Sequence, residues 1–251
     1  MREEDKVYFL GCSGYFYWGW KGKFYPQELQ PKEWLSYYAR LFNTVEINST
    51  FYNFPKVSNL RRFYKETPRG FLFSVKMNRT ITHVRKLRDV ADMIRDFYGV
   101  VREGLREKLG CILFQLPPSY KYSEQNLERV LCQLDSDFKN VIEFRHESWW
   151  RDEVYKALRD RDITFCSVSS PKFPEVLIQT SDTVYIRFHG KEGWYRYNYS
   201  EEELKEWAER IRNSSAREVF AYFNNDYNAY APHNCLKLAE LLDIKPYREV
   251  S

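Results

Sequence analysis

Short runs of apolar, β-branched and aromatic residues recur along the chain, and each gives way abruptly to polar or charged side chains. Most of these runs are continuous rather than alternating, which is typical of parallel strands covered on both faces. The pattern predicts eight strands, at Val7 to Cys12, Thr44 to Asn48, Phe71 to Lys76, Cys111 to Leu116, Val141 to Arg145, Ile163 to Val168, Val184 to His189 and Val219 to Asn224.

Segments with helical spacing separate most of these strands. The clearest begins at Ser200, where Ser200 and Glu203 form a capping box and apolar residues follow at i, i+3, i+4 and i+7, namely Leu204, Trp207, Ala208 and Ile211. Pro31 can open an earlier helix, and Ser123 can cap another. Ser169 to Glu175 holds two prolines and little helical pattern, so we expect the sixth strand and helix unit to be irregular.

About eight alternations of strand and helix favour a closed barrel over an open doubly wound sheet, because the chain has no Gly-rich first turn and no low-complexity linker. With 251 residues, 43% of them hydrophobic, the chain is long enough to bury one large core. We therefore expect an α/β protein with a single domain, residues 1–251, built as one (β/α)8 barrel of the TIM type.

Charge and cysteine content narrow the class further. The net charge of +4 is too mild for a dedicated nucleic-acid binder, although it permits an anionic ligand. The five cysteines are scattered and include no CxxC pair, which indicates reduced core thiols. The amino terminus is charged and no run approaches the roughly 18 apolar residues of a membrane span, so we expect a cytoplasmic protein without a membrane partner.

Titratable side chains gather where the predicted strands end. In a TIM-type barrel these ends meet at one face, so Glu46, Glu143 and His189 are expected to lie together. Two carboxylates in unequal surroundings can act as an acid and a base, and the imidazole can shuttle a proton or stabilise an oxyanion. A buried Glu46 needs a cationic partner, which Lys76 or Arg145 could supply. The alternative is a structural network of ion pairs without catalysis.

Cationic side chains from three strands are expected at the same mouth. Lys76, Arg145 and Arg187 would hold an anion there, because arginine can grip a phosphate or carboxylate with two hydrogen bonds. The polar strand-end residues Asn48, Gln115 and Asn224 would line the same pocket. We therefore expect a small anionic, phosphate-bearing ligand.

An aromatic loop follows the first strand. It contains Trp18 and Trp20 among seven aromatic residues between Tyr15 and Tyr25, and its glycines permit motion. These rings are expected to bind substrate and close over it, or alternatively to form a plug that seals the barrel.

No cofactor is expected. The chain has neither a P-loop nor a dinucleotide-binding fingerprint. A zinc or manganese site would require His189 and His146 to join Glu46, Glu143 or Asp226. Because the sequence lacks HxxxH and HExxH motifs and a compact carboxylate cluster, we do not expect a divalent metal.

Seven motifs together resemble the YecE-like family, domain of unknown function 72: GCSGYFYWGWKGKFYP, NTVEINSTFY, FSVKMNRTITH, FQLPPSY, EFRHESWW, YIRFHG and FAYFNNDYNAYAPHN. The resemblance spans nearly the whole chain and implies a TIM-type barrel, in a family whose activity is not established. The positions that match family motifs at the barrel mouth are Glu46, Asn48, Lys76, Gln115, Glu143, Arg145, His189 and Asn224.

These observations lead us to expect an enzyme that acts on a small anionic molecule, such as a phosphorylated sugar or a nucleotide fragment, by proton transfer or hydrolysis at the barrel mouth. The reaction class stays open between a hydrolase and an isomerase or lyase, and so does the oligomeric state. One alternative is a protein that binds single-stranded nucleic acid without turnover, through aromatic faces and scattered basic residues. Another is a ligand-binding scaffold.

Overall fold

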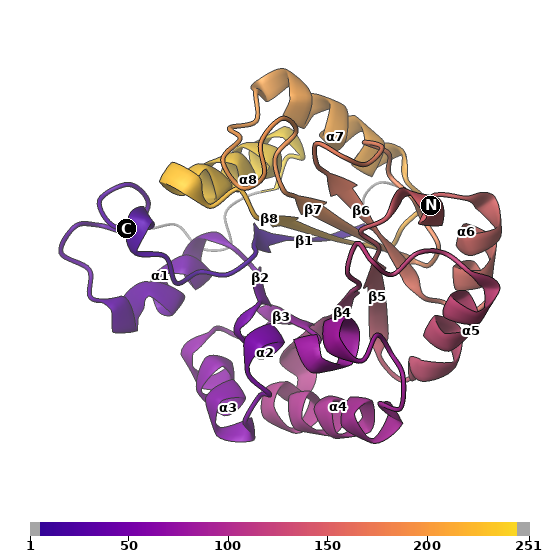
Figure 1. The fold of residues 1–251 in the computed structure, drawn as a ribbon. Coiled ribbons are helices and arrows are strands. Elements are labelled where there is room, and N and C mark those ends of the chain that lie inside the picture. Colours follow the sequence, from indigo (N-terminus) through magenta and orange to yellow (C-terminus); the bar gives the residue numbers. More distant parts are fainter. Residues whose placement is uncertain (1–5, 245–251) are drawn as a thin grey trace.

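Eight parallel strands form the centre of the protein in a computed structural model, which describes residues 6–244 (Figure 1). The hydrogen-bonded order is β1, β8, β7, β6, β5, β4, β3, β2, as in a nearly closed barrel. The predicted TIM-type fold is confirmed. The strands are β1 (Val7–Cys12), β2 (Thr44–Ile47), β3 (Leu72–Lys76), β4 (Leu109–Gln115), β5 (Lys139–Glu143), β6 (Thr164–Ser169), β7 (Thr183–Phe188) and β8 (Glu218–Phe223).

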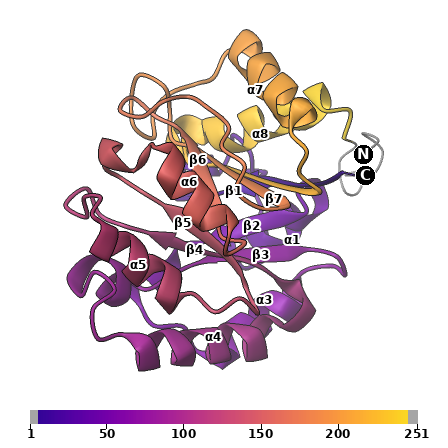
Figure 2. The ribbon, with the colours of Figure 1, turned by 90° about the vertical axis from the view of Figure 1, so that its right-hand side faces the viewer.

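Helices surround the strands, as the side view in Figure 2 shows. They are α1 (Trp34–Leu41), α2 (Ser49–Tyr52), α3 (Val57–Glu66), α4 (Ala91–Leu105), α5 (Glu124–Gln133), α6 (Asp152–Arg159), α7 (Glu201–Asn213) and α8 (Tyr230–Leu241). Ser200 and Glu203 form the predicted capping box of α7, and Ser123 caps α5. Turns and extended backbone, rather than a helix, join β6 to β7 across residues 170–182.

Side chains close the seam between β1 and β2, where the two strands make a single bridge between Ser13 and Glu46. The Tyr38 hydroxyl accepts a hydrogen bond from the Cys12 amide at 2.7 Å and donates to the Thr44 carbonyl at 3.0 Å. Gly11 permits this close approach, because a Cβ atom there would lie 2.1 Å from the Thr44 oxygen. The seam therefore holds Ser13 beside Glu46 at the barrel mouth.

Alternation along the strands decides which side chains face the barrel interior. Tyr185 and Tyr222 belong to an apolar cluster inside the barrel, and the Tyr222 hydroxyl donates to Ser74 at 2.8 Å. Residues two positions further along a strand point to the same side. Arg187 therefore follows Tyr185, and Lys76 follows Ser74, toward the mouth above this cluster.

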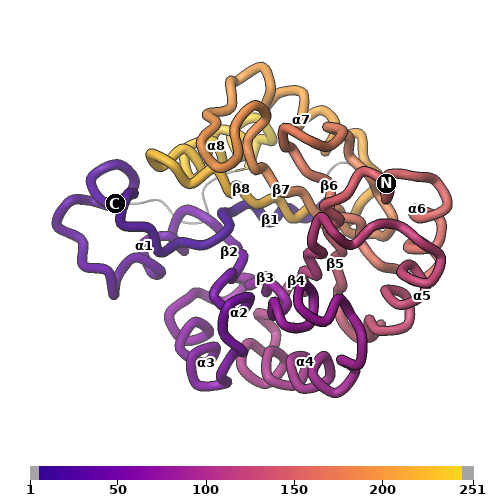
Figure 3. The backbone as a smooth tube through the Cα atoms, in the orientation of Figure 1, coloured from indigo at the N-terminus to yellow at the C-terminus, as the bar shows by residue number. Residues whose placement is uncertain are grey.

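A long loop between β1 and α1, residues 13–33, stands out from the barrel at the indigo end of the chain (Figure 3). Its aromatic rings pack mainly on one another and on α1; Tyr25, for example, stacks on Trp34 with ring centroids 4.8 Å apart. No helix in the described residues combines the length and apolar character that crossing a membrane requires.

Candidate active site at the barrel mouth

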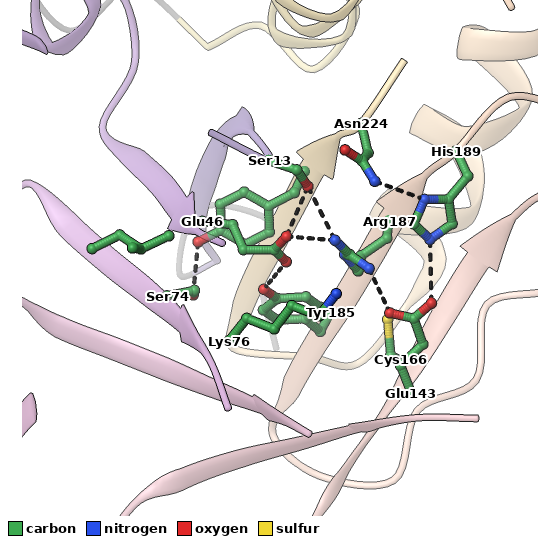
Figure 4. Close-up of polar contacts among 12 residues, drawn as sticks. Ser13, Glu46, Ser74, Lys76, Glu143, Cys166, Tyr185, Arg187, His189 and Asn224 are labelled. Atoms are coloured by element: carbon green, nitrogen blue, oxygen red, sulfur yellow. Dashed lines mark hydrogen bonds and ion pairs between the residues drawn. The ribbon is translucent and has the colours of Figure 1, made fainter. Parts of the chain in front are cut away.

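A buried guanidinium joins two carboxylates across the mouth of the barrel (Figure 4). Arg187 donates through Nη2 to Glu46 at 2.6 Å and through Nη1 to Glu143 at 2.7 Å. Glu46 also accepts from the Ser13 hydroxyl at 2.8 Å and the Tyr185 hydroxyl at 2.6 Å. Glu46 and Glu143 are wholly buried and Arg187 is 1% exposed. Charge-assisted hydrogen bonds in a low-dielectric setting thus join β2, β5, β7 and the residue that follows β1.

Glu143 carries a second set of partners on the solvent side. Its Oε1 lies 2.5 Å from Arg145 Nε and 3.2 Å from His189 Nε2. The amide nitrogen of Asn224 lies 3.1 Å from His189 Nδ1, and the Arg145 guanidinium lies over the Trp194 ring, 4.9 Å from its centroid. Six of the predicted site residues therefore form one connected cluster, namely Glu46, Glu143, Arg145, Arg187, His189 and Asn224.

The protonation states of this cluster follow from burial and charge. Burial alone would raise the pKa of Glu143, but the positive charges of Arg145 and Arg187 and the His189 hydrogen bond outweigh it and hold this pKa well below its usual value. Burial and the Arg145 charge lower the pKa of His189 to about 3. Glu143 is thus ionised and His189 neutral at pH 7. A tautomer protonated at Nε2 donates to Glu143 and accepts at Nδ1 from Asn224, and it leaves Arg145 Nη2, 3.1 Å from Nε2, without an acceptor on the ring.

Lys76 differs from the other charged residues of the cluster. Its amine lies over the Phe51 ring, 4.1 Å from the centroid, and makes no hydrogen bond or ion pair with any of residues 6–244. Burial and the nearby Arg187 charge lower its pKa to about 7. Formal charge acts in the same direction as burial: Arg145 and Arg187 balance the two carboxylates, so the ammonium of Lys76 leaves an uncompensated charge of +1.

This arrangement corrects one expectation. The sequence led us to expect Lys76 or Arg145 as the partner of Glu46, but the partner is Arg187. Arg187 extends from β7 through the barrel interior and uses both ends of its guanidinium fork on carboxylates, which leaves Lys76 unpaired. The predicted anion-holding group Arg187 therefore lies beneath the solvent-exposed surface of the site, whereas Arg145 and Lys76 lie nearer to solvent.

A cavity of about 980 Å³ opens beside Glu46, between the segments that follow β1 and β2 and helix α3. Its wall carries two basic residues, Lys56 and Arg62, and one acidic residue, Glu46. Asn48 also lines it, and the buried Asn48 Oδ1 has no hydrogen-bond partner. The volume lies within the usual range for small-molecule sites, and the charge of the wall favours an anion.

The remaining predicted site residues occupy different positions. Gln115 ends β4, paired in register with Glu143, and is partly buried. Trp20 is wholly buried and donates to the Asp226 carbonyl at 3.0 Å, whereas Trp18 is 64% exposed and packs edge-on against Trp34. Neither tryptophan lines the cavity, so the described structure places both in the aromatic packing of the loop.

Potential metal ligands are dispersed. His146 uses its Nδ1 to accept a hydrogen bond from the Ser148 amide at 3.2 Å. Within the described part of the chain, no group of three or more His, Cys, Asp or Glu side chains is arranged to hold a metal ion.

Three residues that contribute to the cluster or the cavity, Tyr185, Trp194 and Arg62, were not predicted as site residues from the sequence. Tyr185 lies two residues before Arg187 in TVYIRF, and this spacing could have placed it on the same face. Trp194 and Arg62 gave no such signal, because Trp194 lies in an irregular segment and Arg62 in α3 resembles one more solvated charge on a helix.

Comparisons with known proteins agree with this fold. A model of the family described as "Protein of unknown function DUF72" matches residues 9–250. The UPF0759 protein YunF of Bacillus subtilis is 26% identical over an alignment of 275 residues that covers 94% of this chain and 95% of YunF. A solved DUF72 family protein from Thermotoga maritima has a TM-score of 0.86 and 33% identity, with 94% of this chain and 99% of that chain covered. One from Enterococcus faecalis shares the fold, with a TM-score of 0.82 at 21% identity and coverage of 95% and 96%.

Proposed function

This chain belongs to the family of proteins of unknown function DUF72, whose description carries no activity, and we propose from the geometry of its site that it is an enzyme acting on a small anionic substrate at the barrel mouth. One observation carries the proposal: the charged cluster holds one more cation than it holds carboxylates, and the extra cation, Lys76, has no ionic partner in the described residues. A bound anion would supply the missing charge.

The neighbouring cavity supports a small substrate with an anionic group. Arg62 and Lys56 offer positive charge at its wall, and Asn48 offers an acceptor with no partner. Arg145 lies at the edge of the cluster with its side chain 11% exposed, and N–H donors at the edge of its guanidinium are the groups that would bind a phosphate or carboxylate. Lys76 and Arg145 do not line this cavity, but they belong to the charged cluster of Glu46, which does. We assign anion binding to Lys76 and Arg145 because of the excess positive charge of that cluster.

Within this proposal, Lys76 is the group that transfers a proton. The sequence favoured Glu46, Glu143 and His189 for this role. The pKa values of Glu143 and His189, however, lie far below 7, so near pH 7 Glu143 stays ionised and His189 stays uncharged. The Lys76 pKa of about 7 lets its amine accept and return a proton near the pH of most enzymes. Glu143 and His189 then fix the position of Arg145.

The first test is stabilisation by phosphate. At pH 6.5 and constant ionic strength, phosphate at a hundred times its dissociation constant is expected to raise the melting midpoint by roughly 5 °C or more relative to chloride. The variants Lys76→Met and Arg145→Met should lose most of this shift because each removes a cation of the site. Lys205→Met should keep it, because Lys205 is an exposed residue of α7 that pairs with Glu201 rather than with the charged cluster. An equal shift in all four proteins, or none in the wild type, would contradict anion binding here.

Exposed aromatic rings favour a second candidate, the binding of single-stranded nucleic acid. Trp18, Phe16 and Tyr52 are 64%, 51% and 67% exposed, and Phe16 lines the cavity. Such rings can stack on bases. Tight binding of an oligonucleotide that weakens steeply with salt, depends on Trp18 and is unchanged in Lys76→Met would favour this candidate over the enzyme.

A further inference from the structure

The environment of Lys76 bears on the chemical class of the substrate. A lysine can act as a nucleophile only when its amine is unprotonated and reachable. Lys76 ends β3 with a partly exposed side chain, and Figure 4 shows its amine among the carboxylate and guanidinium groups with no dashed contact. Its nitrogen lies over the Phe51 ring, 4.1 Å from the centroid, rather than beside a carboxylate.

A buried lysine elsewhere in the protein, Lys108, shows what a structural role looks like. The Lys108 amine donates to the Tyr64 carbonyl at 2.6 Å, the Thr67 carbonyl at 2.6 Å and the Thr67 hydroxyl at 3.1 Å. All three of its hydrogens are thus used, as is usual for a buried ammonium. Lys76 lacks every one of these anchors, so folding alone does not account for an amine at this position.

Burial is the main influence that favours the neutral form of the Lys76 amine, and the charged groups around it act in both directions. Arg187 and Arg145 repel the ammonium, and His83 interacts with it from the next segment of the chain. Glu46 and Glu143 attract it, but both carboxylates already bind arginine. Together with burial, this balance lowers the pKa of Lys76 to about 7, so about half of the amine is free at that pH.

We infer that the substrate is a small anionic aldehyde or ketone, and that Lys76 attacks its carbonyl carbon to form an imine. This inference rests on the proposed function, because Arg145 would hold the anionic group while the amine reacts. It goes further by naming the reacting group of the substrate and giving Lys76 a covalent role.

The step balances without a cofactor. The lone pair of the Lys76 amine forms a bond to the carbonyl carbon, and the carbonyl π electrons move to its oxygen. The nitrogen loses a proton and the oxygen gains one, which gives a carbinolamine. A further proton lets the hydroxyl leave as water, and the nitrogen lone pair completes a protonated imine. Overall one ammonium and one carbonyl give one iminium and one water, so the charge of the cluster stays the same and the anionic group still balances it.

Borohydride trapping tests this inference on the full-length protein. Dihydroxyacetone phosphate and pyruvate supply a carbonyl with a phosphate or a carboxylate, and dihydroxyacetone supplies the carbonyl without a charge. Each is incubated with the protein and sodium borohydride, which reduces an imine to a stable secondary amine. We expect one adduct per chain with at least one of the two anions, located at Lys76 by peptide mapping. The uncharged probe should give at least tenfold less. An adduct with dihydroxyacetone phosphate but not pyruvate, or the reverse, identifies which anionic group the site prefers.

Matched variants separate this site from adventitious labelling. Lys76→Arg keeps a positive charge but cannot form the imine, so its adduct should disappear while phosphate still raises its melting midpoint. Lys108→Met serves as the control, and its yield of adduct should equal that of the wild type. The trapping rate should fall about tenfold per pH unit below pH 7, as the amine becomes protonated. Trapping that is absent with both anions, equal for the uncharged probe, or unchanged in Lys76→Arg would overturn the inference. If phosphate raises the melting midpoint but no adduct is trapped, the imine is ruled out and the proposed function stands. If phosphate does not raise the midpoint and no adduct is trapped, the proposed function is ruled out as well.

Discussion

Replacement of Arg187 by methionine is expected to lower the free energy of unfolding by about 3–5 kcal/mol at pH 7. The side chain is 1% exposed and is the only arginine that bonds both Glu46 and Glu143 among residues 6–244. Its loss leaves buried carboxylates without their shared counter-charge, and burial strongly opposes such charge. Urea denaturation of purified protein would measure the change.

Two comparisons make this result specific to the ion pairs. Lys205→Met removes only an exposed pair on α7 and should change the free energy by less than about 0.5 kcal/mol. At pH 4 the cost of Arg187→Met should shrink, because carboxylates that lose their cation can take up protons. A cost below about 1 kcal/mol at pH 7, or one that grows toward pH 4, would show that the pairing contributes little.

A second large effect is expected from His189 at mildly acidic pH. An unfolded histidine has a pKa near 6.5, whereas burial and the Arg145 charge lower the pKa of folded His189 to about 3. Between these values the unfolded chain binds a proton that the folded protein does not, so stability falls as the pH falls. From pH 6.5 to 4.5 this one residue should cost the wild type roughly 2–3 kcal/mol.

The substitution His189→Gln should remove this contribution of roughly 2–3 kcal/mol to the fall in unfolding free energy between pH 6.5 and 4.5, whatever the substitution does to stability at pH 7. His83, whose pKa is lowered to about 4, contributes separately in the same window, so His83→Gln is the matched variant. The lowered pKa of Glu143 acts only below about 4.5, and that of Lys76 only above about 7. Curves of unfolding free energy against pH that stay parallel for wild type and His189→Gln would contradict a neutral, buried imidazole.

Much of the fold follows from local sequence. Most strands are apolar runs that give way to polar or charged residues, and such runs mark their own boundaries to within one or two residues, as Val7–Cys12 shows and as Lys139–Glu143 shows with a shift of two. The convergence of Glu46, Glu143 and His189 could also be predicted, since barrel closure brings strand ends together whatever lies between them.

The pairing of charges within the site could not be read in the same way. Which cation reaches Glu46 depends on the depth and direction of side chains inside the barrel, and Arg187 reaches it from the far side of the mouth. The cavity near Arg62 depends on the packing of α3 against the segment after β2. Neither the pairing of Arg187 with Glu46 nor the cavity leaves a periodic pattern in the sequence. The excess positive charge at Lys76 can therefore be recognised only in the three-dimensional arrangement.

The pKa of Lys76 is the most direct measurement of this excess charge. Lysine labelled with ¹³C at Cε, with the Lys76 signal identified from its absence in Lys76→Arg, would report the titration by NMR. We expect an apparent pKa of about 7 in phosphate-free buffer and a clear rise when phosphate is added, because a bound anion stabilises the ammonium. A value near the ordinary 10.4 that does not respond to phosphate would contradict the account.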